Sequence, residues 1–112
     1  KIVLVGHPDL RKEIKRSCHA ALRQRLKVAY HLPPLSKPQT GRYIDFHLKR
    51  CGASPKLFDE DVKSAIHETA RGVPRLINNV ATACLLTAYS KNVKQVSAEV
   101  FSHALDDLHP LL

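Results

Sequence analysis

The chain has 112 residues, a hydrophobic fraction of 44% and a formal net charge of +8. This length suits one domain, and the composition indicates a globular rather than a disordered protein. The sequence has no apolar run long enough to cross a membrane. Its three cysteines, Cys18, Cys51 and Cys84, form no Cys-x-x-Cys pair. We therefore expect an intracellular, cytoplasmic globular protein with neither a disulfide framework nor a zinc knuckle.

The positive charge lies in the first half of the chain. Residues 1–50 contain 12 Lys/Arg and 3 Asp/Glu, whereas residues 51–112 contain 6 and 7. Such a distribution attracts nucleic acid or nucleotide phosphates, although a solvated basic surface gives the same pattern. The chain contains no methionine and begins with an apolar stretch, which is typical of an internal piece of a longer protein.

The first third of the sequence predicts alternating strands and helices. Residues 2–5 form a continuous aliphatic run that ends at Gly6, the pattern of a buried parallel strand. Pro8 and Asp9 then open a helix, and residues 18–25 form a second short helix. Residues 26–32 alternate as a half-buried strand that Pro33-Pro34 ends.

The remainder of the sequence predicts four helices. Ser36 and Gln39 have capping-box spacing for a helix over 36–50. Apolar residues recur at helical spacing over 60–71, 74–90 and 98–108, with Asp59 and Ser97 as N-caps of the first and third of these.

The turn Gly72-Val73-Pro74-Arg75 is the most informative motif. Gly72 suits the left-handed residue after a helix, and Pro74 suits the first position of the next helix. Arg75 then projects from a helix start, where N–H groups and the helix dipole favour an anion. An exposed arginine without a function is the alternative.

Together these segments resemble the C-terminal part of an AAA+ ATPase of the ExeA (GspA) type, a group that includes transposon-associated ATP-binding helper proteins. The matching segments are residues 4–10, 22–26, 30–35 and Gly72-Val73-Pro74-Arg75-Leu76-Ile77-Asn78-Asn79. The resemblance implies a mostly α fold, in which residues 1–35 hold two short strands and short helices from the end of the α/β core. Residues 36–112 would form a four-helix lid.

The resemblance also implies roles for individual residues. His7 would occupy the sensor 1 position, although the family more often has Gln or Asn there. Arg25 would be the arginine finger that acts on the neighbouring subunit's ATP, with Arg23 as the second candidate. Arg75 would be sensor 2, with Gly72 and Pro74 shaping the nucleotide-binding turn.

Other expectations concern ligands and partners. The resemblance implies ATP and Mg²⁺ as cofactors and a homo-oligomer joined through ATP-site interfaces. It favours DNA and a transposase as partners over a secretion role. The chain lacks a Gly-x-x-x-x-Gly-Lys-[Ser/Thr] phosphate loop and a strand ending in paired acids, so we expect no hydrolysis by these residues alone. In the family these two strands flank the absent phosphate-loop strand, so we expect the chain to rearrange or self-associate.

Three other interpretations remain open at this point. Residues 59–90 could form a DNA-binding helix-turn-helix that presents Arg75, Asn78, Asn79 and Thr82. The helices could instead form a module that only binds a partner protein. A metal site from His47 and Cys51 has suitable helical spacing but no visible third ligand.

Overall fold

The computed structural model of the chain describes residues 1–111, and the side chains of residues 1–110. The chain divides into two compact units, Lys1–Pro33 and Pro34–Leu112. The division falls two residues before the domain boundary expected after residue 35. Leu112, the last residue of the expected lid, lies outside the described residues.

The first unit contains short helices and no buried side chain. Its elements are α1 (Pro8–Ile14), η1 (Ser17–His19) and α2 (Ala20–Arg25). Pro8 occupies the first turn of α1, and Asp9 places a negative charge beside the positive end of the helix dipole. Both predicted helices are therefore present, although the second begins as a 3₁₀ turn.

Neither predicted strand is present in the structure. Residues 2–5 and 26–32 have no regular secondary structure, and Ile2, Val5 and Val28 are each more than 80% exposed. A strand needs a neighbouring backbone to pair with its N–H and C=O groups, and neither segment has such a partner within residues 1–111. The prediction of two strands was wrong, since local apolar patterning does not show whether a pairing partner exists.

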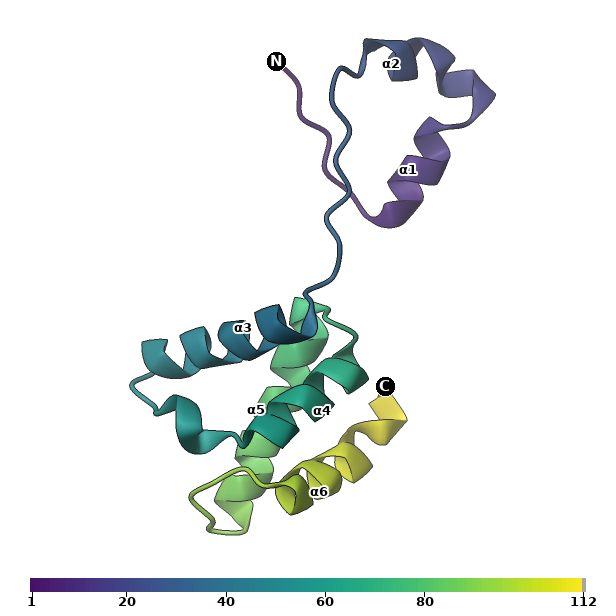
Figure 1. Ribbon diagram of the computed structural model, residues 1–112. Coiled ribbons are helices and arrows are strands. Elements are labelled where there is room, and N and C mark those ends of the chain that lie inside the picture. Colours follow the sequence, from purple (N-terminus) through teal and green to yellow (C-terminus); the bar gives the residue numbers. More distant parts are fainter. Residues whose placement is uncertain (112) are drawn as a thin grey trace. The chain divides into compact units, whose positions relative to one another are not determined.

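The second unit is a bundle of helices (Figure 1). Its elements are α3 (Lys37–Arg50), η2 (Pro55–Leu57), α4 (Glu60–Ala70), α5 (Pro74–Ser90), α6 (Ala98–Leu108) and η3 (His109–Leu111). Its four α-helices are those that the sequence predicts. The part of the chain that the structure describes is thus mostly helical, and its β structure is a single parallel bridge between Phe58 and Val96.

Local sequence explains where several of these helices begin. The Ser36 hydroxyl accepts from the Gln39 backbone, and the Gln39 side chain accepts from the Ser36 backbone, which completes the predicted capping box. Asp59 and Ser97 hold the N-cap positions of α4 and α6 but make no side-chain cap. The Asp59 carboxylate instead accepts from Gln95, in the loop before α6.

The core of the second unit lies where α3, α4, α5 and α6 meet. Burying these side chains drives the packing of the bundle, since each helix presents one apolar stripe inward. The buried apolar residues are Ile44, Leu48, Phe58, Val62, Ile66, Ala70, Ile77, Val80, Cys84, Ala88, Val96, Val100 and Ala104. None of the described helices is long and apolar enough to span a bilayer.

Candidate functional site

The turn between α4 and α5 contains two consecutive left-handed residues. α4 ends at Ala70, after which Arg71 has φ 52° and Gly72 has φ 75°. The Arg71 N–H donates to the carbonyl of His67 at 2.7 Å, and the Val73 N–H donates to that of Ala70 at 3.0 Å. These bonds satisfy carbonyls at the end of α4 and reverse the chain before α5.

Gly72 cannot be replaced at this turn without a clash. Its backbone is buried, and a Cβ atom built on it would lie 2.0 Å from the carbonyl oxygen of Leu35. The N–H of Leu35 donates to the carbonyl of Gly72 at 2.8 Å. The glycine is therefore required both for its positive φ and for the close approach of the segment before α3.

Arg75 lies exposed in the first turn of α5, directly after this turn. The N-cap residue Val73 provides no side-chain acceptor, so the first-turn N–H groups have no side-chain cap. Within the described side chains, the guanidinium of Arg75 makes no hydrogen bond or ion pair. Gly72, Pro74 and Arg75 are thus brought together in one element, and the positive end of α5 coincides with an unpaired cation.

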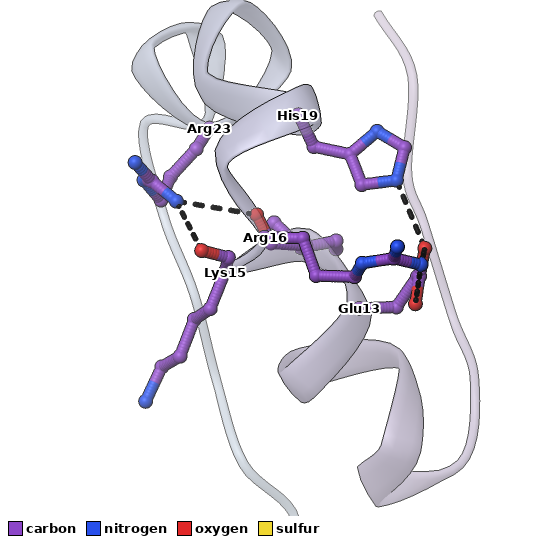
Figure 2. Close-up of polar contacts among 6 residues, drawn as sticks. Glu13, Lys15, Arg16, His19 and Arg23 are labelled. Atoms are coloured by element: carbon purple, nitrogen blue, oxygen red, sulfur yellow. Dashed lines mark hydrogen bonds and ion pairs between the residues drawn. The ribbon is translucent and has the colours of Figure 1, made fainter.

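Arg23 and Arg25 differ in their side-chain contacts, and Figure 2 shows those of Arg23. Arg23 donates to the carbonyl of Lys15 at 2.8 Å and approaches that of Ile14 at 3.5 Å, so it caps the end of α1. Arg25 ends α2 and makes no side-chain hydrogen bond or ion pair to the described residues. Of these two candidates, Arg25 has the guanidinium that is not used to hold the fold.

Glu13 organises a second set of contacts in the same unit. Its carboxylate pairs with Arg16 at 3.0 Å and lies 3.1 Å from a ring nitrogen of His19 (Figure 2). This contact links the end of α1 to η1 across the intervening turn. His7 lies exposed at the N-cap position of α1, where its side chain makes no cap. Its carbonyl accepts from Leu10 at 2.9 Å.

Sequence reasoning missed a buried lysine between α3 and α4. The Lys63 side chain is 5% exposed, and its ammonium lies 2.8 Å from Asp45 and 2.7 Å from Glu60. Burial lowers the pKa of Lys63, but the bonds and charges of Asp45 and Glu60 outweigh burial and raise it. The available signal was its helical spacing from Ile66 and Ala70, which lie three and seven residues later on the inner face of α4.

Contacts in the structure bear on the DNA-binding helix-turn-helix interpretation of residues 59–90. Asn78 accepts a hydrogen bond from the Tyr43 hydroxyl at 3.0 Å, so its side-chain oxygen, which a bidentate contact to adenine needs, already has a partner in the fold. Asn79 and Thr82 line a groove of about 390 Å³ with apolar residues of α5 and with Leu108 of α6. Between Arg75 and Lys91 the sequence of α5 has no charged residue for phosphate contacts.

The His47 ring packs edge-on against two aromatic rings on α3. It lies 4.5 Å from the Tyr43 ring centroid and 5.5 Å from that of Phe46. No group of three His, Cys, Asp or Glu side chains within the described part of the chain is arranged to hold a metal ion.

Comparison with curated proteins shows a similarity to general secretion pathway protein A of Aeromonas hydrophila, which is 29% identical over 96 residues. The match covers 86% of this chain but 18% of the relative, so the chain spans less than a fifth of that protein. No family model matches the sequence, and no solved structure matches it. The similarity supports the resemblance of the chain to the ExeA/GspA type.

Proposed function

We propose that this chain is part of an ExeA-like ATPase, in which the turn before α5 presents Arg75 to a nucleotide phosphate. The observation that carries the proposal is an exposed guanidinium, without a partner among the described residues, at an uncapped helix start. Backbone N–H groups and the helix dipole attract the same anion as the arginine does. The distant similarity to general secretion pathway protein A supports the same assignment.

The residues of the turn fit one edge of ATP rather than the whole nucleotide. Arg75 can neutralise charge on a terminal phosphate, and Pro74 fixes the backbone from which its helix starts. The turn contains neither a phosphate-loop motif nor a pair of acidic residues that could bind Mg²⁺. ATP with Mg²⁺ would supply the phosphoryl group and its charge compensation, while this chain supplies a contact to the phosphates.

Arg25 is the residue we assign to the arginine finger. Its guanidinium is exposed at the end of α2 and is not engaged in the fold, unlike that of Arg23. A permanently charged planar group suits the charge that spreads over a transferred phosphoryl group, and such fingers contribute about 10³ to 10⁵ in rate. The role requires a homo-oligomer in which Arg25 reaches a neighbouring subunit's ATP. His7 remains the candidate for the sensor 1 position.

Two cellular processes, secretion and DNA transposition, are candidates for the role of the proposed ATPase. A role in secretion is supported by the name of the similar protein. A role in DNA transposition, with DNA and a transposase as partners, is supported by the basic first half of the chain, which has 12 Lys/Arg and 3 Asp/Glu in residues 1–50. Measured binding of DNA at physiological salt would favour transposition over secretion.

The phosphate contact is testable with the 112-residue chain and inorganic pyrophosphate. We expect the side-chain Nε–H of Arg75 and the first amides of α5 to shift in NMR spectra as pyrophosphate is added. Arg75→Gln removes the charge and should abolish the shifts of the α5 amides, which both chains share. Arg71→Gln removes an exposed charge from the same turn and serves as the matched control. Equal responses in the two variants would show that pyrophosphate responds only to net charge, and would contradict the proposal.

A further inference from the structure

Three contacts fasten the start of α3 to the end of α4 and to the turn that follows. The Leu35 N–H donates to Gly72, Lys37 pairs with Glu68 at 3.4 Å, and Thr40 lies 2.9 Å from a ring nitrogen of His67. We call these six residues the linker clamp, because Leu35 lies near the end of the segment that joins α2 to α3, directly after Pro33-Pro34.

The contacts of the clamp differ in strength. Lys37 and Glu68 are both more than half exposed, so their ion pair adds little. The Thr40 side chain is fully buried, and its hydroxyl finds its side-chain partner on α4. A buried hydroxyl without a partner is costly, so this bond fixes the distance between α3 and α4.

The bond at the turn is the contact closest to Arg75. Leu35 approaches the Gly72 backbone so tightly that a Cβ atom would overlap its carbonyl oxygen. Gly72 is followed by Val73, the N-cap of α5, so the position of Gly72 sets where α5 and Arg75 begin. A change in the backbone at Gly72 therefore moves Leu35. Conversely, displacement of Leu35 breaks its hydrogen bond to Gly72, so that the turn is no longer held.

We propose that Leu35 is a positioning residue for Arg75, and that the clamp makes the linker respond to an anion at the turn. The positioning role of Leu35 rests on the contacts of the clamp, and the response to an anion rests on the proposed function. In this arrangement the backbone is held from Leu35 onward, directly after the stiff Pro33-Pro34 pair. The signal would pass through one hydrogen bond, from Gly72 to Leu35.

A matched pair of glycines tests the clamp. Gly72 and Gly52 both follow helices with φ near 75–78°, but a Cβ on Gly52 meets nothing within 4 Å. Gly72→Ala and Gly52→Ala therefore share the backbone strain, and only Gly72→Ala displaces Leu35. We expect the Leu35 amide to exchange with deuterium about fivefold faster or more in Gly72→Ala. Unchanged exchange relative to Gly52→Ala would overturn the proposal.

A second pair covers the case in which Gly72→Ala does not fold. Leu35→Pro removes the N–H donor, while Leu35→Ala keeps it and removes the apolar side chain that packs against the core. With pyrophosphate as the probe, we expect Leu35→Pro to weaken binding at Arg75 about fivefold and Leu35→Ala to leave it within twofold. Equal weakening in both variants would assign the effect to packing and overturn the positioning role.

The same titration separates the two proposals. In the unmodified chain, shifts at Arg75 accompanied by a shift of the Leu35 amide support the coupling. Shifts at Arg75 with an unmoved Leu35 amide contradict it. If pyrophosphate shifts neither residue, the phosphate contact of Arg75 fails, and the exchange rates of the two glycine variants still decide whether the clamp exists.

Discussion

The ammonium group of Lys63 lies 2.8 Å from a carboxylate oxygen of Asp45 and joins α4 to α3 inside the bundle. The exposed carboxylate of Glu60, one turn earlier on α4, pairs with the same ammonium group. A cation this deeply buried is tolerated because both carboxylates compensate for its lost hydration. The pair therefore fixes how α3 and α4 face each other, and removing one partner leaves the other charge uncompensated.

Lys63→Met is expected to lower the free energy of unfolding by about 1–3 kcal/mol, because it keeps the apolar stem but leaves Asp45 half-buried without its cation. Urea denaturation of the 112-residue chain at pH 7 measures the change. Lys37→Met is the matched control, because it breaks an exposed pair with Glu68 and should cost at most about 0.5 kcal/mol. Equal losses in the two variants would contradict a special role for Lys63.

The Lys63 pair also predicts a pH dependence. Its pKa is raised above the ordinary value of 10.5, so its contribution is fully present below that value. The contribution is lost as the pH rises through the higher pKa of the folded state. We therefore expect the stability difference between the unmodified chain and Lys63→Met to be constant from pH 7 to 9 and to shrink above pH 10.5. A difference that shrinks already between pH 7 and 9 would contradict this assignment.

Arg71→Gly is expected to stabilise the fold. Arg71 holds a left-handed conformation with φ 52°, which costs a residue with a Cβ about 1 kcal/mol. The greater freedom of glycine in the unfolded chain offsets part of that gain, so we expect a net increase of about 0.5 kcal/mol in the free energy of unfolding. Asn92 is also left-handed, but asparagine tolerates this region, so Asn92→Gly should change stability less. Thermal unfolding ranks the two variants, and a larger gain for Asn92→Gly would contradict the argument.

Burial should make the three cysteines react differently with iodoacetamide. Cys84 is fully buried in α5, and burial raises its pKa to about 11. Because the thiolate is the nucleophile, Cys84 stays protonated and inaccessible at pH 8, whereas Cys18 and Cys51 are exposed. Mass spectrometry is expected to show fast labelling of Cys18 and Cys51, with Cys84 labelled only on unfolding. Fast modification of Cys84 in the folded chain would contradict its place in the core.

The sequence predicted those elements whose signals are local. The capping box of Ser36 and Gln39 and the start of α5 at Pro74 depend on residues a few positions apart, and both appear as predicted. The left-handed Gly72 was likewise expected from its place after a helical pattern. The helix ends one residue earlier than predicted, because Arg71 also adopts the left-handed conformation.

Contacts between distant segments could not be predicted in the same way. Residues 2–5 have the apolar sequence pattern of a buried strand but form no strand. Strand formation requires pairing with a second backbone, and the local sequence does not reveal whether one is available. The approach of Leu35 to Gly72 joins residues 37 positions apart, and the cap of α1 by Arg23 crosses a turn. Arg75 was found from the turn between two helical patterns and Arg25 from the family resemblance, and the phosphate-binding roles of both stay predictions.

Arg23→Ala and Arg25→Ala separate a structural arginine from a candidate functional one. Arg23 caps the carbonyls at the end of α1, whereas Arg25 makes no side-chain bond to the described residues. Since no side chain in residues 1–33 is buried, the short helices there depend on such polar contacts. We expect Arg23→Ala to destabilise α1 by about 0.5–1.5 kcal/mol and Arg25→Ala to leave it unchanged. Carbon chemical shifts of Pro8–Ile14 in the 112-residue chain measure the helix population. Equal loss of α1 helicity in both variants would place Arg25 in the fold and remove the structural reason for choosing it as the finger.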